Sequence, residues 1–319
     1  MKLLDLASWR LGWTAHGPGS PHGVRLSSHF QAIFSAAERR TVGYEALIRA
    51  TRADGLAIEP MQLFTSVPDG APRADLDRRC RTVQIEQFMR LGDERSSLFL
   101  NLDPCRVIEP RFAGVFAGVL ESCTLSAERV AIELTEWPGP CEERLADAAA
   151  FYRELGCCIV VDDFGAGQSN FDRVWRLKPD IVKIDREMTR RLSTNTAARR
   201  MLAGIVAVLQ DGGAAVCVEG IETEDQALCA IDAGADLLQG FYFSRPAEAL
   251  VAPEACRDVF DHLRDVSARR RHAAAASESS FRPAPHSVAR RSRNILRHAR
   301  SNGNVIKLRR RAATGDDAA

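Results

Sequence analysis

The stretch "CCIVVDDFG", residues 157–165, places two adjacent aspartates at the end of a short apolar run. The β-branched residues predict a buried strand, and Gly165, followed by "AGQSN", predicts a turn directly after it. Adjacent carboxylates raise each other's pKa and oppose ionisation, so Asp162 and Asp163 need a cation or a shared proton close by. The stretch therefore predicts both a strand and a charged site at its carboxyl end.

Similar apolar runs recur along the chain and alternate with helical patterns such as 75–92, 143–156 and 223–234. An early pair, "SHFQAIFS" and "VGYEAL", is joined by "AERRT" and predicts an antiparallel hairpin. The later runs are "SLFLNLDP", "RVAIELTE", "CCIVVDDFG", "DIVKID", "AAVCVEGIE" and "LLQGFYFSRP". Because strands alternate with helices, we expect a mostly parallel sheet covered by helices.

Two architectures fit this alternation, an open doubly wound sheet and a closed (β/α)8 barrel. In an open sheet only the strands that flank the switch point can meet one ligand, whereas in a barrel every strand delivers its carboxyl end to one mouth. Nearly every run here ends in an acid, an amide or a lysine. This distribution favours the (β/α)8 barrel.

The composition is that of an ordinary globular protein: of 319 residues, 45% are hydrophobic and 27% are charged. No apolar run reaches the roughly 18 residues that a membrane helix needs. The amino terminus, "MKLLDLASWRLGW", lacks the continuous apolar core of a secretory signal. Nine cysteines without a CxxC pair indicate reduced thiols rather than a zinc site. We therefore expect a cytoplasmic protein without a transmembrane segment.

The net charge of +1 conceals an uneven distribution. Twelve arginines and one lysine from Arg269 onward, against three acidic residues, give the end of the chain a charge near +10 and leave about −9 on the remainder. We expect a loose leader over 1–22, one folded domain over 23–265, and a basic, disordered tail over 266–319. The tail is either a solubilising extension or an attachment to an anionic surface or nucleic acid.

Taken one at a time, the polar residues at the strand ends have ordinary structural explanations. A lone glutamate can face solvent, an asparagine can cap a turn, acids favour the first turn of a helix, and a lysine can pair with a nearby aspartate. Many uncompensated carboxylates at one barrel mouth would nevertheless repel strongly, and one or two divalent cations would remove that conflict. The residues in question are Glu45, Asn101, Glu133, Glu136, Asp162, Asp163, Lys183, Asp185, Glu219, Glu222 and Gln239.

The residue types indicate which cation would bind and which chemistry would follow. Carboxylate and amide oxygens without histidine or thiolate select hard ions, Mg²⁺ or Mn²⁺, over zinc. Two such cations bridged by a shared aspartate would lie about 3.5–4 Å apart and clamp both oxygens of a phosphoryl transfer. Lys183 would orient the attacking water or offset phosphate charge. The seven histidines lie mainly in the leader and the tail, so neither a Ser/His/Asp triad nor a cysteine–histidine pair is evident.

In their order along the chain, these motifs resemble the EAL domain, the bacterial cyclic di-GMP phosphodiesterase. Glu45, Ala46 and Leu47 stand at the Glu-Ala-Leu signature, and Arg49 follows. The further matching signatures are "NLDP", "ELTE", "DDFGAG", "KID", "EGIE" and "QGFYFSRP". The resemblance covers the segment from about 24 to 250. It implies a TIM-like (β/α)8 barrel of EAL type with one antiparallel strand.

The resemblance also implies an activity. Cyclic di-GMP would be hydrolysed to linear pGpG by a two-metal mechanism with Mg²⁺ or Mn²⁺, in a homodimer, and the lowered cyclic di-GMP would regulate biofilm and motility decisions. One metal would be held by Glu45, Asn101, Glu133 and Asp162, and the second by Asp162, Asp163 and Glu219.

The remaining matching residues would act around those metals. Lys183 would contact the nucleophilic water, and Arg49 would contact a substrate phosphate. Glu136 would brace the loop that carries Asp163, while Glu222 and Gln239 would support the ligands and the substrate. Glu219, besides its place as a ligand, is alternatively the general base, and the sequence leaves this open.

The chain departs from the family pattern at four positions. The family usually has Thr, Tyr and Ser where Ala166, Gln168 and Asn170 stand, and an aromatic residue commonly stands at Ala50. None of the proposed ligands is lost, so we expect an active enzyme. The alternatives are a catalytically silent receptor for cyclic di-GMP or a protein-interaction module, and a metal phosphohydrolase with another substrate.

Overall fold

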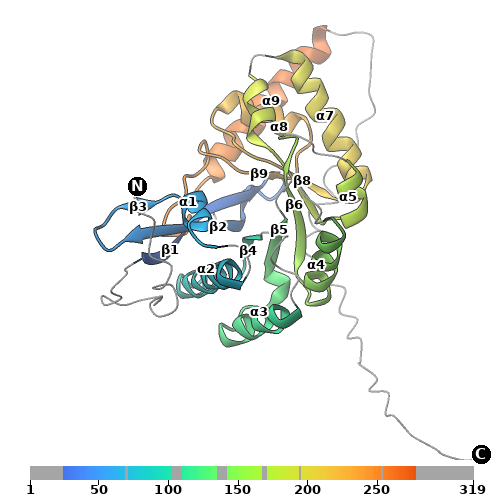
Figure 1. The fold of residues 1–319 in the computed structure, drawn as a ribbon. Coiled ribbons are helices and arrows are strands. Elements are labelled where there is room, and N and C mark those ends of the chain that lie inside the picture. Colours follow the sequence, from blue (N-terminus) through green and yellow to red (C-terminus); the bar gives the residue numbers. More distant parts are fainter. Residues whose placement is uncertain are drawn as a thin grey trace, which may run out of the picture.

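The strands of the protein close into a barrel (Figure 1). The structure is a computed structural model that describes residues 24–68, 71–102, 110–134, 142–166, 171–193, 195–252 and 254–277. Its strands are β1 (Val24–Ser35), β2 (Arg40–Arg52), β3 (Ala57–Ile58), β4 (Ser97–Leu102), β5 (Val130–Leu134), β6 (Cys158–Phe164), β7 (Ile181–Ile184), β8 (Ala215–Val218) and β9 (Leu237–Leu238). The neighbours follow the order β1-β9-β8-β7-β6-β5-β4-β2, and β1 pairs with β2 to complete the ring.

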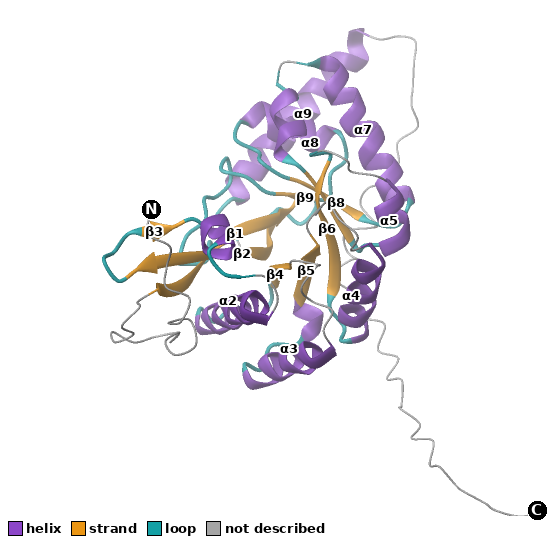
Figure 2. Cartoon of the chain, viewed as in Figure 1, coloured by secondary structure: helices purple, strands orange, loops and turns teal. Residues whose placement is uncertain are grey.

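The helices lie around the strands, as the colours of Figure 2 show. They are α1 (Pro60–Thr65), α2 (Ala71–Arg90), α3 (Pro110–Ser122), α4 (Glu142–Glu154), α5 (Phe171–Leu177), α6 (Arg186–Arg191), α7 (Thr196–Asp211), α8 (Glu224–Asp232) and α9 (Arg257–Ser277). Among the described helices, none combines the length and apolar character that a bilayer crossing requires.

The strand directions confirm the predicted barrel with one antiparallel strand. β1 runs antiparallel to both of its neighbours, β2 and β9. The other neighbours around the ring are parallel. Parallel strands joined by helices bring their carboxyl ends to one rim, which becomes the mouth of the barrel.

The barrel interior has two layers, because alternate side chains of each strand point inward. The layer toward the amino ends of the parallel strands is a buried apolar cluster of Ile33, Val42, Phe99, Ala131, Val160, Ile181, Ala215, Cys217 and Leu237. On four strands, and directly after β8 and β9, the residue two positions after a member of this cluster is polar: Asn101, Glu133, Asp162, Lys183, Glu219 and Gln239. The sequence pattern therefore builds an apolar layer inside the barrel and a polar layer next to it, at the carboxyl ends of the parallel strands.

β1 and β2 continue beyond the ring as a two-stranded ribbon (Figure 1), paired from Val24↔Arg52 to Ser35↔Arg40. One face of the ribbon packs on α1 and α2 through a separate apolar cluster: Leu26, Ile48, Ala50, Leu63, Val67, Leu76, Cys80 and Val83. Gln31 and Glu45 are directly opposite one another in this pairing and lie at the mouth of the barrel.

Helix α9 continues past residue 265, where we expected the folded domain to end. Ser267 is fully buried, and its hydroxyl donates to the carboxylate of Asp232 on α8. The alanines of "RRRHAAAAS" favour helix without needing large apolar side chains, which is why composition placed this boundary too early. The expected leader over 1–22 and the remainder of the expected tail, 278–319, lie outside the described residues.

Candidate functional site

Seven polar side chains from successive strands meet at the carboxyl end of the barrel. Five lie on strands β2, β4, β5, β6 and β7, and two directly follow β8 and β9; in that order they are Glu45, Asn101, Glu133, Asp162, Lys183, Glu219 and Gln239. Asn101 and Glu219 are half-buried, and the others are buried. The barrel thus holds most of the residues singled out from the sequence within one low-dielectric site.

Lys183 is the centre of this cluster. Its Nζ lies 2.5 Å from Glu219 Oε1, 2.7 Å from Glu133 Oε1, 3.3 Å from Glu45 Oε2 and 3.4 Å from Asp162 Oδ1. Only 1% of its side chain is exposed to solvent. Four carboxyl groups share one ammonium group, so the lysine alone does not balance the negative charge that the cluster carries when all four are ionised.

Glu45 is held by two amides as well as by the lysine. Asn101 Nδ2 donates to Glu45 Oε1 at 2.9 Å, and Gln239 Nε2 donates to Glu45 Oε2 at 2.7 Å. Gln239 also reaches Gln31 Oε1 on β1, at 3.4 Å. Sequence reasoning missed Gln31, although its place in the hairpin, directly opposite Glu45, could have drawn attention to it.

Burial and mutual repulsion raise the pKa of several carboxyl groups in the cluster. Burial, followed by the charge of Glu45, holds the pKa of Glu133 well above its usual range. Burial likewise raises the pKa of Glu219 to about 8, even though Lys183 pulls it down. The pKa of Asp162 is also raised, again mainly by burial. These carboxyl groups therefore hold protons more tightly than exposed acids do.

Glu45 and Lys183 have pKa values that favour their charged forms, because each is stabilised by the opposite charge of its neighbours. Burial would raise the pKa of Glu45, but the positive charge of Lys183 and the amide of Gln239 outweigh it, and the pKa lies below its usual value. Burial would lower the pKa of Lys183, but the surrounding carboxylates raise it well above its usual value. The glutamate of the Glu-Ala-Leu signature is therefore the carboxylate most firmly kept ionised.

An irregularity in β6 turns Asp163 toward the mouth. The register of β6 against β7 shifts between Val161 and Phe164, and Asp163 has φ 55°, in the left-handed region. A non-glycine residue there costs roughly 1–3 kcal/mol, and bulges of this kind re-aim side chains. As a result, one carboxylate oxygen each from Asp162, Asp163 and Glu219 lie within 4.8 Å of one another. Burial and the adjacent Asp162 raise the pKa of Asp163 to about 6.

The donor set fits divalent metal ions. Four carboxylates contact a single ammonium group and a fifth, Asp163, lies beside two of them. Glu133 Oε2 is buried and accepts no hydrogen bond from the described residues. An oxygen-only set of carboxylates and an amide suits a hard cation, and a cation would satisfy both the repulsion and the unpaired oxygen. Glu45, Asn101, Glu133, Asp162, Asp163 and Glu219 could hold such ions.

Other residues singled out from the sequence lie elsewhere. Glu222 is exposed before α8, where its backbone N–H donates to Gln226 Oε1 at 2.8 Å. Asp185, which the sequence allowed as an ion-pair partner of Lys183, instead caps α6 by accepting from the backbone N–H of Glu187 at 2.8 Å. Glu136, Gln168 and Asn170 lie outside the described residues.

Two departures from the family pattern are visible in the structure. Ala50 belongs to the apolar cluster beneath α1 and α2 and is almost fully buried. A larger side chain there would have to displace other members of this cluster, so alanine suits the packing. Ala166 closes the turn after β6, where its backbone N–H donates to the carbonyl of Asp163 at 3.1 Å.

Arg49 lies in a groove on the ribbon, beyond Glu45 on β2. The groove has a volume of about 1020 Å³ and is lined on β1 and β2 by Arg25, Ser27, His29, Arg49 and Thr51, among others. Arg49 Nη1 donates to the carbonyl of Ile48 at 3.0 Å, and Arg49 has no ion pair among the described residues. Its charge is therefore available to an anionic ligand.

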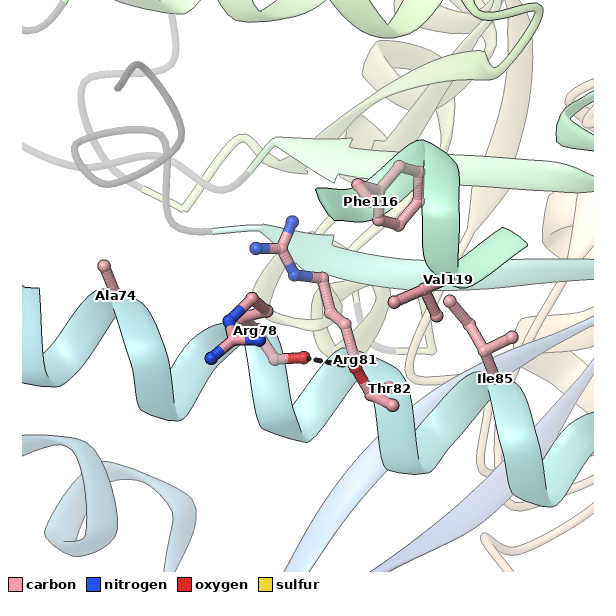
Figure 3. A pocket seen from close by; sticks show the side chains of 7 residues that line it. All are labelled: Ala74, Arg78, Arg81, Thr82, Ile85, Phe116 and Val119. Carbon is pink, nitrogen blue, oxygen red and sulfur yellow. Dashed lines mark hydrogen bonds between the residues drawn. The ribbon is translucent and has the colours of Figure 1, made fainter. Parts of the chain in front are cut away.

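A second cavity, between α2 and α3, has a different character (Figure 3). Its volume of about 20 Å³ is suited to a single water molecule. The guanidinium of Arg81 lies 5.7 Å from the centre of the Phe116 ring and pairs with Asp77 at 2.5 Å. This cavity belongs to the packing of the two helices and not to the mouth.

The geometry and the motifs point to one family, and comparison with known proteins agrees. The sequence model of the EAL domain matches residues 20–246. This chain belongs to the EAL domain family. The match confirms the resemblance drawn from the sequence motifs.

Relatives of this EAL domain include proteins with and without an assigned activity. The uncharacterized EAL-domain containing protein YkuI of Bacillus subtilis (strain 168) is 29% identical over 229 residues, which are 70% of this chain and 55% of YkuI. The probable cyclic di-GMP phosphodiesterase PdeI of Escherichia coli (strain K12) is 27% identical over 228 residues, which are 68% of this chain and 28% of PdeI. The chain therefore spans only part of the length of these relatives.

Solved structures share the fold of this EAL domain. The crystal structure of YkuI in complex with c-di-GMP and calcium matches with a TM-score of 0.68 and 26% identity, over 79% of this chain and 63% of that one. Klebsiella pneumoniae BlrP1 in its manganese and cyclic di-GMP complex at pH 9.0 matches with a TM-score of 0.64 and 29% identity, over 73% of this chain and 57% of that one.

Proposed function

We propose that this EAL domain is a phosphodiesterase that hydrolyses cyclic di-GMP to linear pGpG. The observation that carries the proposal is the gathering of five carboxylates and one asparagine at the barrel mouth, where four of the carboxylates contact the buried Lys183. The name of PdeI and the complexes of YkuI and BlrP1 with cyclic di-GMP support the substrate class.

Two Mg²⁺ or Mn²⁺ ions would be held by this donor set. One would be bound by Glu45, Asn101, Glu133 and Asp162, and the second by Asp162, Asp163 and Glu219. Such ions act as Lewis acids that polarise a phosphodiester and stabilise its developing charge. The raised pKa values of Glu133 and Glu219 mean that these carboxyl groups would release protons as they become ligands.

The remaining side chains act on the substrate and the attacking water. The Nζ of Lys183 donates hydrogen bonds into the mouth and would orient the water there. Glu219 is either a ligand or the base that takes the proton of that water at its carboxylate, and a raised pKa makes it a stronger base. Gln239 keeps Glu45 oriented, and Arg49 would pair with a substrate phosphate.

A hydrolysis assay tests the proposal directly. Purified protein with cyclic di-GMP and Mg²⁺ or Mn²⁺ should yield pGpG, measured by chromatography, and Glu45→Ala should abolish turnover because it removes a ligand. Glu121→Gln, which changes an exposed acid on α3, should leave turnover unchanged. Folded protein that shows no turnover with either ion would refute the proposed activity.

A silent receptor for cyclic di-GMP, or a protein-interaction module, is the second candidate function. The observation that favours it is the departure from the family pattern directly after Asp163, whose backbone is held in the left-handed region. A loop that fails to keep Asp163 in place would allow binding without hydrolysis. Calorimetry that shows tight binding of cyclic di-GMP beside zero turnover would establish this function instead.

We also propose that the domain forms a homodimer. Helix α5, which follows the loop after Asp163, exposes two large aromatic side chains, Trp175 at 80% and Phe171 at 46%. Exposed aromatic side chains on one helix are typical of protein interfaces. Light scattering should give the mass of a dimer, and Trp175→Glu should give that of a monomer; a monomeric parent protein would contradict this.

The basic end of the chain would contact an anionic surface or nucleic acid. The support is its charge, twelve arginines and one lysine against three acids from Arg269 onward. Retention on anionic vesicles or DNA should fall when residues 278–319 are removed and when salt is raised. Retention that does not depend on salt would contradict an electrostatic attachment.

A further inference from the structure

The ammonium group of Lys183 is surrounded by oxygen atoms much as a bound cation is. Its Nζ contacts one oxygen from each of four carboxyl groups, which come from four different strands or strand ends, at distances between 2.5 and 3.4 Å. Because only 1% of the side chain is exposed, protein oxygens rather than water surround the charge. Proteins hold hard metal ions in shells of carboxylate oxygens of the same kind.

The contacts of Lys183 involve both groups of ligands proposed for the divalent ions. Glu45 and Glu133 belong to the first group, and Glu219 belongs to the second. Asp162 is shared by both. The two shortest contacts, 2.5 Å to Glu219 Oε1 and 2.7 Å to Glu133 Oε1, reach one carboxyl group of each group. A divalent ion at either place therefore draws on a carboxylate that the ammonium already contacts.

The charges of the mouth balance only when the lysine is counted. Ligand carboxyl groups are deprotonated when they bind metal, so the five carboxylates then carry five negative charges. Two divalent ions and Lys183 together carry five positive charges. Without the lysine the loaded mouth would keep a negative charge, which would attract the metal ions more strongly and repel an anionic phosphodiester.

The residue type at this position is rare in the chain. Of its 43 lysines and arginines only four are lysines: Lys2, Lys178, Lys183 and Lys307. Arginine presents a planar fork that suits one pair of oxygens, whereas the ammonium of lysine is a compact point charge with three donors. The compact group is the one that four oxygens can approach from several strands. The mouth thus carries the side chain that most resembles a small monovalent cation.

Lys183 has two opposing effects on metal binding, and the structure indicates which is larger. It gathers the carboxylates, which favours binding, and it repels a second cation, which opposes binding. Glu45 does not depend on the lysine for its position, because Asn101 Nδ2 and Gln239 Nε2 donate to it at 2.9 and 2.7 Å, while Lys183 Nζ lies farther away at 3.3 Å. Asp163 is directed to the mouth by the irregularity in β6. The repulsion should therefore outweigh the gathering.

We propose that Lys183 is a built-in counter-ion that weakens the binding of divalent metal ions at the mouth and leaves the loaded mouth electrically neutral. The inference rests on the proposed function, because it takes the carboxylates as ligands of two such ions. This role is separate from orienting the attacking water, since it acts before any substrate is present. It makes Lys183 a residue that sets metal affinity.

Titration of Mn²⁺ into the metal-free protein, followed by the electron paramagnetic resonance signal of the free ion, measures this affinity without substrate. Lys183→Met removes the charge and keeps a long side chain, and it should bind Mn²⁺ at least about tenfold more tightly than the parent. Lys183→Arg keeps the charge and should bind no more tightly than the parent. Lys178→Met, which changes an exposed lysine, is the matched control and should bind as the parent does.

The direction of the change separates this proposal from a structural role of the lysine. If Lys183 mainly gathers the carboxylates, Lys183→Met should bind Mn²⁺ more weakly than the parent. That result, or an unchanged affinity, would overturn the proposal. Tighter binding by Lys183→Arg would overturn it as well, because the charge would then not be the cause. Circular dichroism establishes that each variant is folded.

A measurement on the parent protein decides the question if Lys183→Met does not fold. A buried, hydrogen-bonded ammonium exchanges its protons slowly, so Lys183 should give a proton–nitrogen correlation signal in NMR spectra, assigned by its absence in Lys183→Arg. Saturation with Mg²⁺ should shift this signal, because the ion draws carboxylate charge away from the ammonium. A signal that stays unchanged at saturation would contradict the proposal.

The outcomes distinguish this inference from the proposed activity. If the parent binds Mn²⁺ but does not hydrolyse cyclic di-GMP, the activity fails, and tighter binding by Lys183→Met still supports the counter-ion. If the parent binds Mn²⁺ and hydrolyses cyclic di-GMP while Lys183→Met binds more weakly, only the counter-ion is overturned. If neither protein binds Mn²⁺, the two-metal mechanism and the counter-ion are both overturned.

Discussion

Lys183 is a single side chain on which the charge balance of the mouth depends. Its ammonium lies within 3.4 Å of four carboxylates and is almost fully buried. Removing one partner of a buried ion pair typically costs about 3–5 kcal/mol, because the remaining charge is left uncompensated. Lys183→Met should therefore lower the free energy of unfolding by about that amount in the presence of a chelator, measured by urea denaturation.

The chain offers a matched control for this prediction. Lys178 is the only other lysine in the described part of the chain, and it is exposed. Lys178→Met should change the free energy of unfolding by less than about 0.5 kcal/mol, as surface substitutions do. Equal stabilities of the two variants would show that the carboxylates of the mouth are protonated and do not need the lysine.

Asp93 is a side chain whose effect on stability should depend on pH. Burial would raise its pKa, but hydrogen bonds from the backbone N–H groups of Ser96 (2.6 Å) and Arg95 (2.8 Å) and from the Ser96 hydroxyl lower it overall. A carboxyl group with a lowered pKa stabilises the fold above its unfolded pKa, near 3.9, and loses that contribution as the pH falls through the folded value.

Asp93→Asn should therefore destabilise the protein by about 1–2 kcal/mol at pH 7, where the charged hydrogen bonds are intact. The difference between parent and variant should shrink as the pH falls below about 4. Urea denaturation at pH 7, 5, 4 and 3 measures it. A difference that stays constant over this range would mean that charge plays no part in the contribution of Asp93.

Helix α2 carries ion pairs that look alike in sequence and differ in burial, and Asp75 pairs with Arg78 as well as with Arg79. Asp77 and Arg81 pair at 2.5 Å with side chains only 8% and 11% exposed, whereas Asp75 pairs with Arg79 at 2.7 Å in a half-exposed position. Arg81 also donates to Tyr152 on α4 and lies beside Phe116 on α3 (Figure 3). The buried pair thus joins three helices, while the exposed one stays within α2.

Asp77→Asn should cost about 3–5 kcal/mol of unfolding free energy, because it leaves the Arg81 charge buried without its partner. Asp75→Asn, in the same helix and with the same chemical change, should cost less than about 1 kcal/mol. Thermal or urea denaturation compares the two. Equal costs would show that Arg81 is hydrated in solution and that the small cavity beside it is open to water.

The barrel was predictable from the sequence because its closure follows from a repeated pattern. Each strand run ends in a polar residue two positions after a buried apolar one. Runs such as "IVVDD" and "DIVKID" therefore indicate both the strand and the layer of the barrel in which its polar residue lies. Gln31 was missed because its importance comes from pairing with Glu45 across a hairpin, which a linear pattern does not record. The left-handed backbone of Asp163 and the burial of Ser267 against Asp232 likewise depend on tertiary packing.

The stability of the barrel as a whole should depend on divalent ions if the mouth binds them. An ion that binds only the folded state adds RT ln(1 + [L]/Kd), about 2.7 kcal/mol at a hundredfold excess over Kd.

The Glu133→Gln variant should be more stable than the parent protein in a chelator and less stable than the parent in Mn²⁺. The raised pKa of Glu133 shows that its charge destabilises the metal-free fold at neutral pH, so the variant should unfold at a higher temperature than the parent in a chelator. In Mn²⁺ the parent should be the more stable, because the variant has lost a ligand. Thermal unfolding in chelator, in MnCl₂ and in NaCl of equal ionic strength measures both effects, and equal gains from Mn²⁺ in the two proteins would place the ion elsewhere.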